Sequence, residues 1–171
     1  MLGVRQPPAP TLRDVAWQAV LRAGFPLLRR WWRLRGRKPN GALVAVHVRD
    51  KLLLVRSSYR TAWNFPGGNL RKGETPEAAA RRELFEEVGI TAVSLTPLGH
   101  GGGRWEGQRN VVHFFELRLD SPPDLRLDNR EIIGAMLVSP EQIRTMPVTG
   151  PVAFYLRRNF VVGSPDLGHG M

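Results

Sequence analysis

The sequence predicts a mixed α/β domain, in which helices pack on a β-sheet, preceded by a helical extension. Two observations support this prediction. Short segments rich in Val and Leu lie on both sides of one strong helix signal, and further helix signals occur near both ends of the chain. The 171 residues suffice for one domain, and a hydrophobic content of 42% excludes a wholly disordered chain. The chain has no cysteine, which excludes a disulfide framework, a thiolate metal site and a cysteine nucleophile.

Residues 1–39 are expected to form a basic helical extension. The first 40 residues hold nine basic residues and one acidic residue, or +8 of the net charge of +10. Thr11 is a candidate N-cap for a helix that fills most of this segment, with a kink or break near Pro26. We expect the folded domain to cover residues 40–162 and residues 163–171 to form a flexible tail.

One face of the predicted N-terminal helix is apolar and the rest is basic. Apolar residues spaced four, three and four positions apart form a stripe: Leu21, Phe25, Leu28 and Trp32. Basic residues lie elsewhere around the helix: Arg22, Arg29, Arg33 and Arg37. Three interpretations follow, in decreasing order of preference. The stripe packs on the domain or on a sister subunit in a homodimer, residues 11–37 lie on an anionic membrane surface, or they bind nucleic acid. No run of 18 apolar residues predicts a spanning helix, and no signal peptide is evident. We therefore expect a cytoplasmic location, with membrane association as the alternative.

The other elements of the domain follow from local patterns. Residues 42–48 and 52–55 are rich in Val and Leu and are expected to form a hairpin through the polar segment Arg49-Asp50-Lys51. A short apolar segment, residues 63–65, leads into Pro66-Gly67-Gly68. Further elements are expected as strands at 92–98, 111–119 and 132–138, a glycine-rich turn at 99–109, and helices after Ser139-Pro140 and at about 152–158.

The strongest helix prediction covers residues 76–88. Thr75 can cap this helix, Pro76 occupies its first position, and Gly89 can end it. At about 100° per residue, three glutamates fall within one arc of the helix: Glu83, Glu86 and Glu87. Three apolar residues point away from that arc and are expected to pack on the sheet: Leu84, Phe85 and Val88.

Three carboxylates on one helix face repel one another. Each like-charge pair one turn apart costs a few tenths of a kcal/mol even when it is exposed. A divalent cation reverses this repulsion, and oxygen ligands suit Mg²⁺ or Mn²⁺. The cluster contains no Cys or His, which argues against zinc. The alternative interpretation is a solvated acidic face.

The segment from Gly68 to Ile90 resembles the Nudix box. It reads Gly68, five residues, Glu74, seven residues, Arg82-Glu83-Leu84, one residue, Glu86-Glu87, one residue, Gly89-Ile90, and so matches nine specified positions over 23 residues. The wider resemblance covers about residues 40–160. It implies a Nudix-like α/β/α sandwich with a mixed sheet. It also implies hydrolysis of a phosphoanhydride bond in a nucleoside diphosphate linked to another moiety, or in a related diphosphate, with Mg²⁺ or Mn²⁺.

The resemblance also implies roles for individual residues. Glu86 and Glu87 match the principal metal ligands, and the backbone carbonyl of Gly67 matches another. Glu83 matches a residue that binds metal or acts as the base. Arg82 and Glu74 match a pair that orients the carboxylates, and Gly68 matches the structural glycine of the box. Two alternatives stand beside this interpretation: a catalytically weak Nudix-fold binding module tethered by its basic helix, and, less favoured, an isomerase, for which the usual reactive Cys is absent.

Candidate residues outside the box are less specific. Glu131 is the first candidate for an additional metal ligand or base, with Asp128 and Glu106 as alternatives, and glycine occupies position 134, near which many Nudix domains carry a second acid. The candidates for contacting a diphosphate or a base are Arg56, Tyr59, Arg60, Arg104, Trp105 and Arg109. Two histidines within strand patterns are expected to be packed or on the surface rather than catalytic: His47 and His113.

Overall fold

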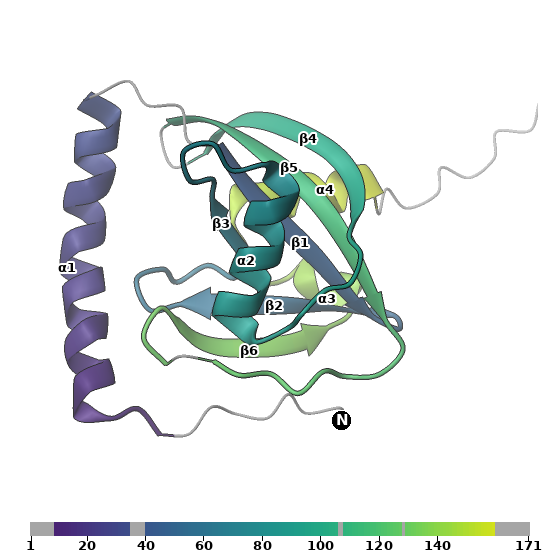
Figure 1. The fold of residues 1–171 in the computed structure, drawn as a ribbon, viewed down its shortest axis with the longest axis horizontal. Coiled ribbons are helices and arrows are strands. Elements are labelled where there is room, and N and C mark those ends of the chain that lie inside the picture. The colour runs from purple at the N-terminus through teal and green to yellow at the C-terminus, as the bar shows by residue number, and fades with distance from the viewer. Residues whose placement is uncertain (1–8, 35–39, 106–107, 128, 160–171) are drawn as a thin grey trace, which may run out of the picture.

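The computed structural model describes residues 9–34, 40–105, 108–127 and 129–159. Its elements, in chain order, are α1 (Leu12–Leu34), β1 (Asn40–Val48), β2 (Lys51–Ser57), β3 (Gly67–Asn69), α2 (Pro76–Val88), β4 (Thr96–Trp105), β5 (Gln108–Leu119), β6 (Ile132–Val138), α3 (Pro140–Ile143) and α4 (Gly150–Asn159). Figure 1 shows a strongly twisted sheet crossed by α2, with α1 along one side of the domain. The tail expected at 163–171 lies outside the described residues.

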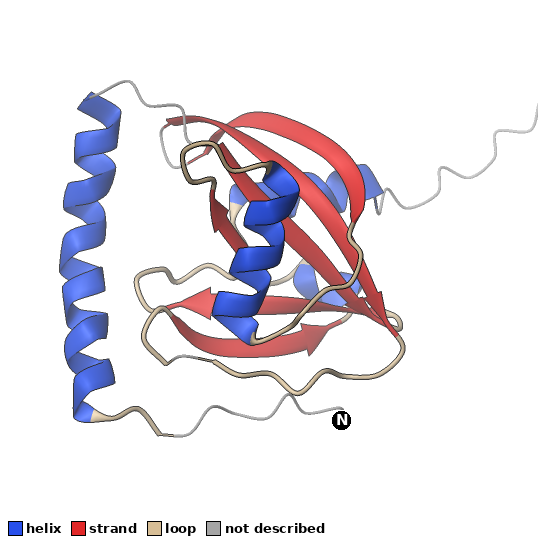
Figure 2. Ribbon diagram, in the orientation of Figure 1, coloured by secondary structure: helices blue, strands red, loops and turns tan. Residues whose placement is uncertain are grey.

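The sheet is mixed, as expected. Its strands run in the order β4-β5-β1-β2-β6, and β3 pairs with β1. β1 lies parallel to β5 and antiparallel to β2 and β3. Because side chains alternate along a strand, β1 contributes to two cores, one on each face of the sheet. Ala42, Val44 and Val46 pack with α2, whereas Leu43 and Ala45 pack on the side of α3 and α4. Figure 2 shows helices on both faces, which gives the three layers of an α/β/α sandwich.

α2 begins and ends where its capping residues predict. The Thr75 side chain accepts a hydrogen bond from the backbone N–H of Ala78, and Gly89 ends the helix with φ of 74°. Leu84 and Val88 are fully buried against the sheet. The expectation for Phe85 is wrong, because its side chain is 60% exposed. Position 85 follows Leu84 by about 100° around the helix and lies on the solvent side of the apolar stripe.

The glycine-rich segment forms a strand rather than the expected turn. β4 begins at Thr96, so residues 92–95 are not part of it, and it continues through the glycines to Trp105. From Gly99 to Trp105 each residue of β4 pairs with one of β5, for example Gly102 with Val111 and Arg104 with Arg109. Cross-strand pairing with β5 outweighs the low strand propensity of glycine. At Gly101 a Cβ would lie 2.5 Å from the Phe154 ring, so glycine is required where α4 packs on the strand.

α1 is one continuous helix from Leu12 to Leu34, which contradicts a break near Pro26, one of the two outcomes expected there besides a kink. A proline removes a single intrahelical hydrogen bond, and the turns on either side of it remain helical. Thr11 caps the helix as expected, since its side chain and that of Asp14 exchange hydrogen bonds with each other's backbone N–H. Some predicted stripe and basic side chains lie outside the part that the structure describes: Leu28, Arg29, Trp32, Arg33 and Arg37.

α1 contacts the domain, as the first interpretation expects, but Arg22 and Gln18, which make two of the contacts, lie outside the predicted apolar stripe. Arg22 donates to the backbone carbonyl of Ser58 at 2.9 Å, and Gln18 donates to that of Asn129 at 2.7 Å. The membrane and nucleic-acid interpretations stay predictions, as does the homodimer. Within the described ranges, no helix combines the length and apolar character needed to cross a membrane.

Candidate active site

The carboxylates of α2 lie beside the short strand β3. Pairing of Gly67 with Leu43 of β1 holds β3 above the helix, and the backbone N–H of Gly67 donates to Oε2 of Glu87 at 2.8 Å. Glu87 is only 9% exposed, whereas half of the Glu86 side chain reaches solvent. Three residues with two glycines carry no strand pattern, so no strand is predicted at β3; pairing with β1 makes this segment a strand.

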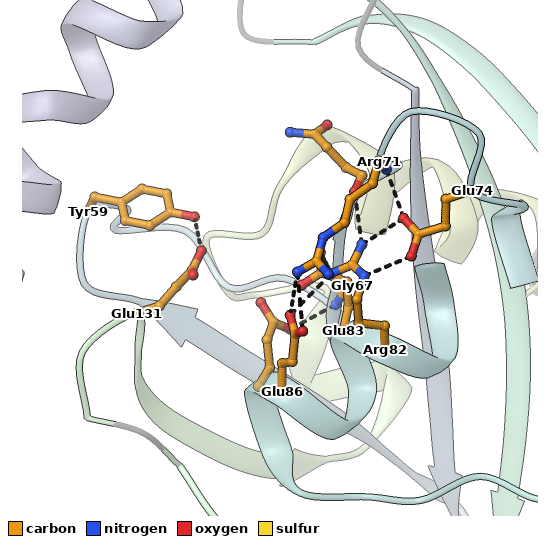
Figure 3. A network of polar contacts seen from close by, with 10 residues as sticks. Tyr59, Gly67, Arg71, Glu74, Arg82, Glu83, Glu86 and Glu131 are labelled. Carbon is orange, nitrogen blue, oxygen red and sulfur yellow. Dashed lines mark hydrogen bonds and ion pairs between the residues drawn. The ribbon is translucent and has the colours of Figure 1, made fainter. Parts of the chain in front are cut away.

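Arg82 is the centre of the polar network in Figure 3. Its Nε and Nη2 donate to the two carboxylate oxygens of Glu74 at 2.7 and 2.9 Å, and Nη1 donates to Glu83 at 2.6 Å and to Glu86 at 3.1 Å. Hydrogen bonds from Arg82, followed by one from the backbone N–H of Arg71, lower the pKa of Glu74 to about 2. The pKa of Arg82 is raised, mainly by Glu74. A bidentate pair of this kind fixes the guanidinium, which in turn orients the carboxylates.

Gly68 makes room for Glu83. A Cβ at position 68 would lie 2.6 Å from Oε1 of Glu83, closer than real contacts allow. Burial raises the pKa of Glu83, and the nearby charges of Glu131 and Glu86 raise it further against the opposing effect of Arg82. The carboxylates are therefore close enough to repel one another.

Glu131 faces the cluster from the segment before β6. Its Oε1 accepts a hydrogen bond from the Tyr59 hydroxyl at 2.8 Å (Figure 3). Burial, together with the charge of Glu131, raises the pKa of Tyr59. A side chain at Gly134 would meet Trp63 and Arg56 at ordinary contact distances, away from the cluster. The two alternatives to Glu131 lie outside the described residues: Glu106 and Asp128.

A cleft of about 800 Å³ joins these groups. It is lined by most of the residues that the sequence singles out: Gly67, Gly68, Arg82, Glu83, Glu86, Glu87, Glu131, Tyr59, Arg60, Arg104 and Trp105. Glu74 does not line the cleft; it contacts Arg82, which does. Arg56 does not line it either, and its guanidinium lies 5.3 Å from the Trp63 ring centre. Arg109 is exposed outside the cleft.

Sequence reasoning missed several lining residues: Val20, Leu21, Gly24, Asn64, Arg71, Asn110, Thr149 and Gly150. Arg71 stands at a variable position of the box, and its guanidinium contacts both oxygens of Glu86 at 3.2 and 3.4 Å. Val20, Leu21 and Gly24 reach the cleft because α1 docks beside it, and Thr149 and Gly150 because the start of α4 does. The apolar stripe predicts that the N-terminal helix packs on the domain, but no local pattern predicts that it packs at this cleft. His47 is packed as expected, with Nε2 3.0 Å from the Tyr155 hydroxyl, and burial lowers its pKa.

The donor chemistry of the cleft suits a hard divalent cation. Among the residues that the structure describes, its acidic lining consists of the carboxylates Glu83, Glu86, Glu87 and Glu131, and no His lines it. Among the described residues, no three such side chains converge closely enough to form a ready metal site. Guanidinium groups instead contact Glu83 and Glu86, and the pKa of Glu83 is raised first by burial and then by the charges of Glu131 and Glu86. Oxygen donors without nitrogen or sulfur fit Mg²⁺ or Mn²⁺ and fit zinc poorly.

Comparison with known proteins agrees with this arrangement. The solved structure titled MutT NUDIX hydrolase from Burkholderia pseudomallei superposes with a TM-score of 0.63 at 19% identity and covers 72% of this chain and 98% of that one. The E. coli dihydroneopterin triphosphate pyrophosphohydrolase gives a TM-score of 0.63 at 20% identity, with 75% and 98% covered. At these identities the likeness concerns the fold.

A similarity in sequence is local. An RNA pyrophosphohydrolase from Hydrogenovibrio crunogenus is 41% identical over 64 residues, which are 37% of this chain and 39% of the relative. The match thus spans about two fifths of the length of that curated relative. The family model described as NUDIX domain matches residues 37–156, which cover most of the chain. The chain therefore belongs to the NUDIX domain family.

Proposed function

We propose that this chain is a hydrolase that requires Mg²⁺ or Mn²⁺ and cleaves a phosphoanhydride bond in a nucleoside diphosphate linked to another moiety, or in a related polyphosphate. The observation that carries the proposal is that Glu83, Glu86, Glu87 and Glu131 line one cleft that also contains cationic side chains. A binding module has no need for clustered carboxylates, which repel one another in the absence of a cation.

In this proposal Glu86, Glu87 and the carbonyl of Gly67 hold the cation, with Glu83 or Glu131 completing the site. When bound, the metal neutralises phosphate charge and lowers the pKa of a water molecule. Glu87 is oriented by the N–H of Gly67, and Glu83 is oriented by Arg82. The support given by Arg82 depends in turn on its bidentate pair with Glu74.

The remaining residues bind the substrate and move the proton. Arg60, Arg71 and Arg104 line the cleft and are suited to contact phosphate oxygens. Glu83 or Glu131 accepts the proton of the attacking water, whose oxygen bonds to phosphorus while the bridging P–O bond breaks. The phosphate-containing leaving group departs with the electron pair of that bond. Positioning and electrostatics supply most of the expected acceleration.

The relatives add one candidate to the set of possible substrates. The matched relatives are named RNA pyrophosphohydrolases, so RNA with a 5′ polyphosphate belongs in the set of candidate substrates. Nucleic acid, the least favoured partner on the sequence alone, thereby becomes a candidate substrate. Dinucleoside polyphosphates, ADP-ribose, coenzyme A and sugar nucleotides complete the set.

The test is product release from this panel with and without Mg²⁺ or Mn²⁺. We expect hydrolysis of at least one compound only with the metal, and a loss of at least 100-fold in Glu86→Gln. The matched control is Glu77→Gln, because Glu77 lies on the same helix but pairs with Arg81 outside the cleft. Hydrolysis that is independent of metal, or unchanged in Glu86→Gln, would contradict the proposal, as would the absence of any hydrolysis across the panel.

A further inference from the structure

α1 lies outside the segment matched by the family model, yet it reaches the catalytic cleft. The match begins at residue 37, whereas α1 ends at Leu34. Val20, Leu21, Gly24 and Phe25 nevertheless line the same cleft as the α2 carboxylates. An element added to the family domain thus supplies part of the wall of its active site.

One stripe of α1 holds the helix against the domain. Its residues are spaced by four, four and three positions: Asp14, Gln18, Arg22 and Phe25. Asp14 pairs with Arg130 at 3.1 Å, Gln18 and Arg22 donate to backbone carbonyls, and Phe25 stacks on Tyr59 with ring centres 4.3 Å apart. The contact between Phe25 and Tyr59 lies next to the carboxylate cluster, because the hydroxyl of Tyr59 donates a hydrogen bond to Glu131.

The neighbouring stripe of α1 faces the cleft and is apolar. Val20, Leu21 and Gly24 offer no side-chain hydrogen-bonding group, and Val20 is 59% exposed. The polar lining of the cleft comes from other elements, with Tyr59 and Arg60 at the edge of the α1 wall and Arg104 among those farther along the chain. A sugar against the α1 wall would leave its hydroxyls without partners, whereas the face of a planar base would lose nothing by contact with it.

Gly24 is the least expected residue of this wall. Glycine inside a helix is less stabilising than alanine, so a local reason for it is needed. A Cβ at position 24 would meet no atom within 4 Å, so no neighbour in the described structure requires glycine there. The space beside the helix backbone opens on the cleft, where a group of the substrate can approach closely.

We propose that α1 forms a second part of the substrate site. It binds a planar aromatic group that lies beyond the phosphates cleaved at the α2 carboxylates. This inference rests on the proposed function. The aromatic group packs on Leu21 and the open face at Gly24, and Arg60 contacts the adjoining phosphate. The guanidinium of Arg60 lies 5.1 Å from the Phe25 ring centre, so it stands where the wall meets the polar part of the cleft. The group is a nucleobase, which either the second nucleoside of a dinucleoside polyphosphate or the second nucleotide of an RNA 5′ end can supply.

The experiment fills the space beside the α1 wall and leaves unchanged the residues that hold α1 on the domain. Gly24→Leu fills the open space, and Ala23→Leu places the same side chain on an exposed position of the same helix, outside the cleft lining. Affinities are measured calorimetrically in Mg²⁺ with three methylene-bridged probes that cannot be hydrolysed: a one-base nucleoside triphosphate, a dinucleoside tetraphosphate and a 5′-triphosphorylated dinucleotide.

We expect the wild-type chain and Ala23→Leu to bind at least one two-base probe at least tenfold more tightly than the one-base probe. Gly24→Leu should lose this preference while its affinity for the one-base probe stays within twofold. The two-base probe that is preferred identifies the source of the base. Equal affinities in the wild type, or a preference retained in Gly24→Leu, would overturn the inference. Binding is measured without turnover, so the two proposals can fail separately. If the wild-type chain prefers a two-base probe, Gly24→Leu loses this preference, and the wild type hydrolyses no compound of the panel, only the proposed function is refuted.

Discussion

Replacing Gly68 by alanine displaces one catalytic candidate without changing its chemistry. The new Cβ would lie 2.6 Å from Oε1 and 2.7 Å from Cδ of Glu83, whereas ordinary contact begins at 3.4 Å. The carboxylate must therefore move by about 1 Å, and a misplacement of that size can lower a rate by about 100-fold. The free energy of unfolding should change by less than about 1 kcal/mol, because a side chain moves rather than the backbone.

Gly67→Ala, in contrast, should lower the stability of the fold. Its Cβ would lie 2.1 Å from the carbonyl oxygen of Ala42 and 2.9 Å from Cα of Leu43, so β3 and β1 must separate. The φ of 140° at Gly67 adds strain of about 1–3 kcal/mol for any other residue. With a total near 3 kcal/mol, the melting temperature should fall by roughly 6–12 °C.

Calorimetric melting and steady-state hydrolysis separate the two effects. Gly102→Ala is the control, because its nearest atom would be an ordinary 3.8 Å away. We expect the melting temperature of Gly68→Ala to match that of the control while kcat/KM falls by about 100-fold. Full activity in Gly68→Ala would refute the reasoning that Glu83 must occupy its present position, and wild-type melting of Gly67→Ala would refute the tight fit of β3 on β1.

Three further predictions concern stability and the docking of α1. Glu74, whose pKa falls to about 2 in the folded chain, stabilises the fold fully above the ordinary carboxyl pKa, and this contribution disappears as the pH falls toward 2. The urea midpoint of the wild type should therefore converge on that of Glu74→Gln between about pH 5 and pH 2, and a constant difference would refute the pairing with Arg82. Leu84→Ala, at a fully buried position of α2, should lower the free energy of unfolding by about 3 kcal/mol in urea titrations, and a loss below about 1 kcal/mol would contradict the packing. Phe25→Ala removes the stack on Tyr59 and should make trypsin cleave α1 at least fivefold faster, with unchanged domain melting; equal cleavage rates would show that the stack does not hold the helix.

Features set by neighbouring residues in the chain could be predicted from the sequence. α2 spans the expected residues because Thr75, Pro76 and Gly89 fix its ends locally. β6 also has the expected bounds, since its run of apolar residues is limited by polar neighbours. The three glutamates share a face because helical spacing alone places them there. These elements carry most of the candidate site.

Features set by tertiary pairing could not be predicted. The glycines of β4 form a strand because they pair with β5. Gly67 joins the sheet because it pairs with Leu43 of β1. The exposure of Phe85 depends on how far the apolar face of α2 rotates toward the sheet. The contribution of α1 to the cleft at Gly24 was not predicted at all. In a helical pattern a glycine only lowers the expected helix stability, and its position beside the cleft is known only from the structure.

Manganese binding tests the central claim most directly, because it needs no knowledge of the substrate. Free Mn²⁺ is followed by electron paramagnetic resonance as the wild type, Glu87→Gln and the control Glu77→Gln are titrated. The glutamine at position 87 can still accept the hydrogen bond from the Gly67 N–H, so the melting temperatures should agree. We expect the wild type and the control to bind Mn²⁺ with equal affinity, and Glu87→Gln to bind at least tenfold more weakly. Equal affinity in all three proteins, or no binding to the wild type, would contradict the assignment of the α2 carboxylates as metal ligands.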